Sequence, residues 1–230
     1  MNNLLHIIKY NLKIIFGNRF VYFLGASLLF YLLFTGIALF SDDQIAIEDV
    51  YYQLIFPGIL LMFFPTSFGI QNDEDARILE ILFGIPNYRY KVWLVRLSII
   101  FVMVFVIVTI LALFNSFLLV ELPVFEMGSQ LIVLLVLFGT LGFLISTMVK
   151  NGNGTAVVMV IVGLALWFLH GFLDASKWNV FLNPFSTPNR ISESLYQTML
   201  WQNRLIIISV SVVAILWGLI NLQRREKFIK

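Results

Sequence analysis

The chain has 230 residues, of which 60% are apolar and only 12% are charged, and it contains no cysteine. This composition excludes an ordinary soluble domain, in which about a quarter of the residues are charged. The absence of cysteine excludes disulfides, thiolate metal sites and a thiol nucleophile.

Six apolar stretches of 17 to 24 residues lack Asp, Glu, Lys and Arg. A helix of about 20 residues crosses the roughly 30 Å hydrocarbon core of a bilayer. Charged residues lie between the stretches or at the chain ends, as expected if a charge at mid-membrane costs several kcal/mol. The pattern predicts an all-α polytopic membrane protein, with one membrane domain over residues 1–230 and six transmembrane helices. The predicted spans are residues 20–40, 54–70, 97–120, 131–149, 155–173 and 205–222.

Residues 1–19 precede the first span and are amphipathic. Asn2, His6, Lys9 and Lys13 fall within one narrow arc of a helical wheel, and most of the Leu and Ile residues lie elsewhere. This pattern favours an N-terminal helix lying in the membrane interface. The alternative is a simple polar flank of the first span.

The second span contains Pro57 and Pro65. Proline removes a backbone donor and restricts the residue before it, so each position either kinks the helix or breaks it and allows movement. Both interpretations stay open from the sequence.

The segment 71–91 follows span two and is too regular for a plain loop. Asp73, Arg77 and Glu80 are spaced to form one charged stripe on a helix, and Asp73 with Arg77 is a favourable pair. Apolar residues occupy the remaining surface until Pro86 ends the helix. We therefore expect a short amphipathic cytoplasmic helix between spans two and three, with a solvated turn as the alternative.

Three polar residues lie towards the outer ends of spans. Asn115 and Ser116 in span three are either hydrogen-bonding groups between helices or substrate contacts. His170 near the end of span five either bonds to a neighbouring helix or interfacial water, or belongs to a permeation path. The sequence 150–154, KNGNG, predicts a tight turn between spans four and five.

The segment 174–203 is too rich in aromatic and aliphatic residues for a free loop. We expect it to dip into the outer interface as two short helices, separated by Asn183-Pro184 and Pro188-Asn189. Trp178 and Trp201 would then lie at the level of the lipid headgroups.

Basic residues set the predicted orientation, since cytoplasmic loops carry an excess of Lys and Arg. The loop 41–53 is acidic and has no base, and the loop before span six holds only Lys177, Arg190 and Arg204. Both termini are therefore expected in the cytoplasm. Membrane insertion explains this charge asymmetry without nucleic-acid binding. The bases left inside are Lys9, Lys13, Arg19, Arg77, Arg89, Lys91, Arg96, Lys150, Arg224, Arg225, Lys227 and Lys230.

The chain lacks GxxxxGK[ST], HExxH, GxSxG and CxxC motifs. No catalytic residue, metal site or nucleotide-binding loop is therefore predicted, and we expect the chain not to be an enzyme. A secondary carrier is disfavoured because no Asp, Glu, Lys or Arg lies within a predicted span to couple a cation.

The order of these parts and one motif resemble the ABC transporter type-2 permease family. That family carries a pattern like E-x-E-x-G-T-L-E-x-L-L-x-x-P-x-x-R after span two, and residues 73–89 here read DEDARILEILFGIPNYR. The chain departs from the pattern at Arg77-Ile78, where Gly-Thr is usual, and Arg96 falls where the family often has Lys. The matching positions are Asp73, Asp75, Leu79, Glu80, Leu82, Pro86 and Arg89.

The resemblance implies the permease subunit of an ATP-driven ABC exporter in the cell inner (cytoplasmic) membrane, surrounded by membrane lipid. The subunit would form the translocation path with a second or homologous permease copy and dock an ABC ATPase subunit, which holds ATP and Mg, while this chain binds no cofactor. A non-transporting accessory or assembly protein of the same fold is the alternative. The implied coupling residues are Asp73, Glu74, Arg77, Glu80, Pro86 and Arg89. The candidates for the path or gate are Pro57, Pro65, Asn115, Ser116 and His170.

Overall fold

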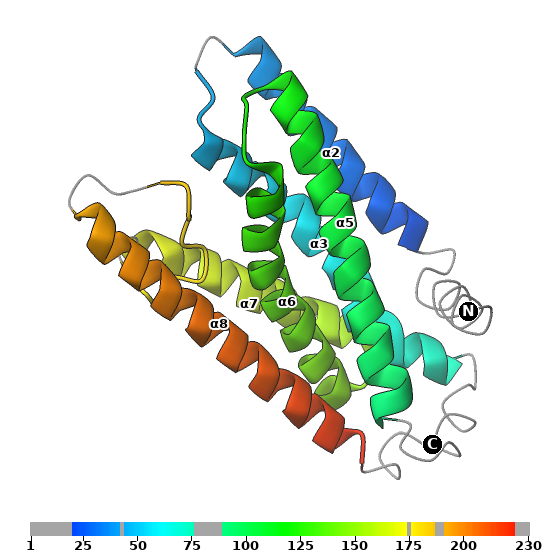
Figure 1. Ribbon diagram of the computed structural model, residues 1–230. Helices are drawn as coiled ribbons and strands as arrows, with labels where there is room; N and C mark the ends of the chain where they lie inside the picture. Colours follow the sequence, from blue (N-terminus) through cyan, green and yellow to red (C-terminus); the bar gives the residue numbers. More distant parts are fainter. Residues whose placement is uncertain (1–19, 42–43, 76–88, 174–175, 187–190, 224–230) are drawn as a thin grey trace, which may run out of the picture.

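The computed structural model describes residues 20–41, 44–75, 89–173, 176–186 and 191–223, with the backbone alone at 74–75 and 89–91. All regular structure in these ranges is helical (Figure 1). Six of the helices are long and apolar enough to cross a bilayer, as the sequence predicted, so the chain is a multi-pass membrane protein. The elements are α2 (Phe20–Phe40), α3 (Ile47–Asp75), the π-helix η1 (Arg89–Leu94), α5 (Val95–Leu118), α6 (Val124–Val149), α7 (Gly152–Phe172) and α8 (Glu193–Asn221).

Several helices extend beyond the apolar stretches that predicted them. Helix α3 begins at Ile47 and not at Leu54, and α8 begins at Glu193 and not at Leu205. The prediction that charges lie outside the membrane helices is therefore wrong near the ends of α3, α5 and α8. Asp73, Arg96 and Arg204 are all helical and buried. Other parts of the chain cover these charged side chains, so the helices can extend beyond the apolar stretches.

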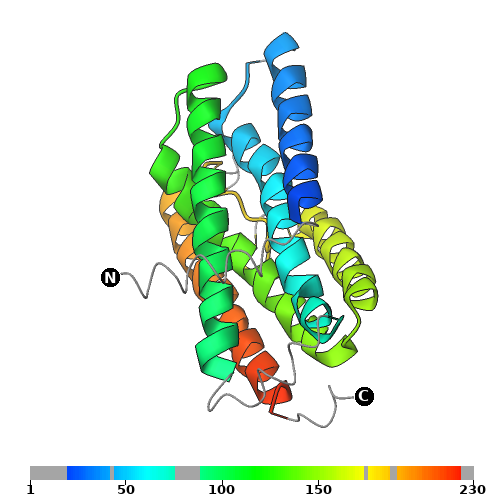
Figure 2. The same cartoon turned by 90° about the vertical axis from the view of Figure 1, so that its right-hand side faces the viewer.

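Helices α3 and α6 form the centre of the bundle. Helix α3 packs against α2, α5, α6 and α7, and α6 packs against α3, α5, α7 and α8. Figure 2 shows α2 and α7 on one side of α3, with α5 on the other. Most of the surface of α2 and α7 is left uncovered by the chain itself, and their exposed side chains are largely apolar. This arrangement suits helices that face lipid.

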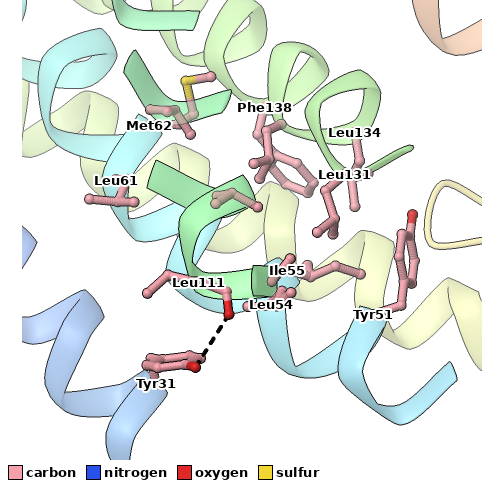
Figure 3. Packing of buried hydrophobic residues seen from close by; sticks show 14 of the residues in the cluster. Tyr31, Tyr51, Leu54, Ile55, Leu61, Met62, Leu111, Leu131, Leu134 and Phe138 are labelled. Atoms are coloured by element: carbon pink, nitrogen blue, oxygen red, sulfur yellow. Dashed lines mark hydrogen bonds between the residues drawn. The ribbon is translucent and has the colours of Figure 1, made fainter. Parts of the chain in front are cut away.

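The main core lies where α3, α5 and α6 meet. Leu54 and Leu61 of α3 and Leu131, Leu134 and Leu135 of α6 are fully buried, and Figure 3 shows several of the residues in this cluster. Lipid tails are as apolar as these side chains, so close packing holds the helices together more than the hydrophobic effect does.

Two glycine residues of α6 allow this helix to pack closely against α5 and α3. A Cβ added at Gly128 of α6 would lie 2.3 Å from Thr109 Oγ1 of α5, and one at Gly142 would lie 2.7 Å from Thr66 Oγ1 of α3.

The bundle has two distinct ends. At the Asp73 end, α3, α6 and α8 finish while α5 and α7 begin; the Asn183 end is opposite. The predicted tight turn between spans four and five is confirmed at the Asp73 end, but it is shorter than 150–154, because α7 already begins at Gly152. Lys150 adopts a left-handed conformation with φ of 58°, and Asn151 Oδ1 caps α7 by accepting from the backbone N–H groups of Asn153 and Gly154.

The expected pair of short helices in 174–203 is wrong. Residues 176–186 form successive turns, and residues 193–203 are the first turns of α8. Asparagine explains the difference, because Asn179 and Asn183 each accept a hydrogen bond from the backbone N–H two residues later, which competes with a helix.

The predicted interfacial helix at 1–19 and residues 76–88 of the predicted coupling helix lie outside the described residues.

Candidate functional site

A buried ion pair joins α3 to α5 at the Asp73 end. Arg96 Nη1 donates to Asp73 Oδ2 over 2.6 Å, and the two side chains are 5% and 3% exposed. The Arg96 guanidinium also lies 4.7 Å from the centre of the Trp93 ring, within the range of a cation–π contact. Removing one partner of a buried pair typically costs about 3–5 kcal/mol, because the other charge is left uncompensated.

Of the predicted coupling residues, Asp73 belongs to this ion pair. Asp73 matches an acidic position of the family motif, yet its carboxylate is turned towards Arg96 and covered. Glu74 lies in the last turn of α3 and Arg89 opens η1, and only their backbones are described. Residues Arg77, Glu80 and Pro86 fall outside the described ranges. The structure therefore places both ends of the motif-bearing segment, and Asp73 at the first end bonds to Arg96, which follows the second end in α5.

A second polar group connects α2, α3 and α5 towards the Asn183 end. Tyr31 Oη donates to Asn115 Oδ1 over 2.7 Å, and Asn115 Nδ2 lies 3.5 Å from Gln53 Oε1. Gln53 Nε2 in turn donates to Thr35 Oγ1 over 2.6 Å. Asn115 is fully buried within this network. Of the two interpretations left open for Asn115, these contacts favour a hydrogen-bonding group between helices.

Ser116 and the two prolines have local partners as well. Ser116 Oγ accepts from the backbone N–H of Leu122 over 3.4 Å, which supports the turn between α5 and α6. Helix α3 runs without interruption through Pro57 and Pro65, so neither proline breaks it. The Pro57 carbonyl accepts from Ser27 Oγ of α2 over 3.0 Å.

His170 contacts the turn segment 176–186. Its Nδ1 lies 3.0 Å from Asn179 Oδ1, and the rings of Tyr52, Trp167 and Phe181 surround it at 5.8 to 6.1 Å between centroids. Tyr52 and Gln53 are neighbours on α3, so one turn of this helix faces His170 of α7 and also reaches the Asn115 network. The two groups of path candidates thus meet at α3.

Sequence reasoning missed a set of residues that hold the segment 176–186 in place. Arg204 of α8 is 8% exposed and donates to Gln130 Oε1 at 2.9 Å and to the Leu182 carbonyl at 3.2 Å. Asn203 Nδ2 donates to the carbonyls of Lys177 and Asn179. The available signal was an Asn-Arg pair at the start of an apolar span, where a charge needs partners.

Two further bonds fix the same segment. Asn183 Nδ2 donates to the Glu48 carbonyl over 3.0 Å, and Tyr196 Oη donates to the Asn183 carbonyl. Phe181 and Leu182 are each 2% exposed, and the Phe181 ring lies 5.9 Å from that of Phe138 on α6. The segment is therefore packed into the bundle and does not project from it.

Among the residues with described positions, no group of three or more His, Asp or Glu side chains is arranged to hold a metal ion. Comparisons with family models, with curated proteins and with solved structures gave no match.

Proposed function

We propose that this chain is the transmembrane permease subunit of an ATP-driven ABC exporter. In this proposal the subunit lies in the inner membrane with both termini in the cytoplasm, pairs with a second permease copy and docks a separate ATPase subunit. The six bilayer-spanning helices supply the fold that such a subunit needs. The motif at 73–89 supplies the likeness to the family.

The ion pair between Asp73 and Arg96 gives the proposal its strongest support. Asp73 and Arg96 are 23 residues apart in sequence, yet their side chains bond at 2.6 Å. The ends of the two helices that flank the motif, α3 and α5, are therefore bonded to each other. An element that receives movement from a cytoplasmic partner needs a defined attachment to the helices it moves, and the pair supplies one.

Hydrogen bonds within the chain reduce the set of residues that are candidates for the translocation path. Asn115 and Ser116 have partners within the chain, so we assign them to the support of the helices. His170 remains a candidate for the path, because it lies on α7, most of whose surface is left uncovered by the chain itself.

Co-purification tests the proposal. The tagged chain is isolated from its native membrane in mild detergent, and the bound proteins are identified and assayed for Mg-dependent ATP hydrolysis. We expect an ABC ATPase at one copy per permease copy, with hydrolysis lost when the ATPase phosphate-loop lysine is replaced by alanine. Isolation of the chain with other membrane proteins and no ATPase would contradict the proposal and favour an accessory or assembly role.

A further inference from the structure

We propose that Asp73 and Arg96 are positioning residues that make the ends of α3 and α5 move as one unit when the partner ATPase acts. This inference rests on the proposed function. It adds a role for Arg96 and its neighbour Trp93, which the family-like motif does not include. Three features support it: the geometry of the pair, the surroundings of Trp93 and the weak point in α3 at Pro65.

The pair is a bond between two helix ends and not a surface contact. Asp73 is in the last turn of α3 and Arg96 in the first turn of α5, and both are almost fully buried. In such surroundings the attraction between opposite charges is much stronger than in water. An opening between the helices would separate the charges within an apolar region, so the pair resists separation more than apolar contacts would.

Trp93 extends this connection to a third helix. Its ring lies beneath the Arg96 guanidinium and 6.0 Å from the ring of Phe143 on α6. A Cβ added at Gly69 of α3 would lie 3.9 Å from Trp93 Cζ3, so the indole also lies beside α3. Both Trp93 Nε1 and Arg96 Nε are buried without a hydrogen-bond partner. The indole and guanidinium thus hold their positions through stacking and the ion pair.

Helix α3 needs this support because of Pro65. Proline has no N–H, so the Leu61 carbonyl loses its helical partner at this point. Thr66 Oγ1 then donates to the Met62 carbonyl over 2.7 Å, a contact that often accompanies bending. The two turns after Pro65 are therefore joined less firmly to the rest of α3. The Asp73–Arg96 pair fixes these turns to α5 instead.

A purely structural ion pair would predict something different. Its removal would lower the stability of the protein, but the two helix ends would keep the same separation in each functional state. A positioning pair predicts that the separation becomes state-dependent once the pair is removed. The distance between the helix ends therefore distinguishes the two roles.

The test uses the complete complex in lipid nanodiscs. The chain has no cysteine, so Asn72→Cys on α3 and Ser98→Cys on α5 accept two spin labels without background. Distances between the labels are measured without nucleotide and with ATP and vanadate, in the parent and in Arg96→Gln, Asp73→Asn and the exchange variant Asp73→Arg with Arg96→Asp. Leu94→Gln, an exposed position on the preceding turn, is the matched control.

We expect one narrow distance in both states for the parent and the Leu94→Gln control. Arg96→Gln and Asp73→Asn should broaden the distribution in the trapped state, lower the ATP hydrolysis rate by about tenfold and leave the ATPase bound. The exchange variant should restore the narrow distance. If Arg96→Gln alone fails to fold, Asp73→Asn carries the measurement.

Two results would overturn the inference: a parent distance that changes on trapping, or single variants that keep one distance in both states. If the chain carries no ATPase, the proposed function fails. The distance in the isolated chain then still reports whether the pair holds α3 to α5, so the two failures are distinguishable.

Discussion

Tyr31 Oη donates a hydrogen bond to Asn115 Oδ1 over 2.7 Å and joins α2 to α5 across 84 residues of sequence. Tyr31 Oη also lies 3.3 Å from the Leu111 carbonyl (Figure 3). Helix α2 otherwise exposes most of its surface, so this tyrosine is a main polar attachment of the helix to the bundle. The contact explains how a tyrosine and an asparagine are accommodated within apolar spans.

Tyr31→Phe should therefore destabilise the protein by about 0.5–1.5 kcal/mol, the range for a hydrogen bond between membrane helices. Unfolding in mixed micelles with increasing SDS measures the change. Tyr22→Phe is the matched control, because Tyr22 is on the same helix and 76% exposed. Unchanged stability with altered transport in Tyr31→Phe would instead place Asn115 in the path.

Gly128 allows α6 to approach α5 closely. A Cβ there would lie 2.3 Å from Thr109 Oγ1, so Gly128→Ala should cost about 1–3 kcal/mol of stability through overpacking. Thr109 Oγ1 is buried without a hydrogen-bond partner, so Thr109→Ala should be nearly neutral and should rescue Gly128→Ala.

The same SDS unfolding measurement checks this pair. Gly25→Ala is the control, since nothing lies within 4 Å of a Cβ at that position and alanine favours the helix. A double variant as unstable as Gly128→Ala alone would show that the close approach is not the cause.

Within the segment 176–186, Phe181 should be protected from water-soluble reagents and Trp178 should be accessible to them. Phe181 is 2% exposed and Trp178 is 61% exposed, so a water-soluble maleimide should react far more slowly with Phe181→Cys than with Trp178→Cys. Adding Asn203→Ala removes two bonds to the segment and should speed the reaction at position 181 by roughly tenfold. Equal rates at the two cysteines would contradict the packed arrangement.

The distribution of Lys and Arg predicts the orientation of the chain in the membrane. Reporter fusions after Lys230 and at Asp43 should report opposite sides of the membrane, with the Lys230 fusion in the cytoplasm. Both reporters on one side would invalidate the proposed topology.

The fold was largely predictable from the sequence because a bilayer allows few alternatives. A stretch of about 20 apolar residues has to be helical to satisfy its backbone, which is why the span at 20–40 coincides with α2. Helix ends were less predictable, since Arg204 directly precedes the apolar stretch 205–222 but lies well inside α8. Its partners Gln130 and Leu182 come from distant parts of the chain.

The candidate site was predictable only in part. Asp73 was selected from its spacing to Arg77 and Glu80 and from the family-like motif, and both grounds suggested an exposed stripe. The structure instead pairs Asp73 with Arg96, because a carboxylate in the last turn of α3 faces the first turn of α5. Spacing within one helix contains no information about which face a second helix covers.

ATP hydrolysis by the proposed partner ATPase, measured in the reconstituted complex with Glu80→Lys, is the most direct test of the proposed coupling role of residues 73–89. Glu80 lies on the predicted charged stripe, where a structural helix tolerates substitution within about 0.5 kcal/mol. A coupling element makes different contacts in two states, and charge reversal there disturbs the balance between them. Pro86→Leu is tested beside it, and Lys150→Glu is the control for charge reversal at the same end of the bundle. We predict that Glu80→Lys and Pro86→Leu insert normally but lose most of the hydrolysis and export that Lys150→Glu retains. Normal hydrolysis and export in both variants would contradict the assignment of this chain as a permease coupled through residues 73–89.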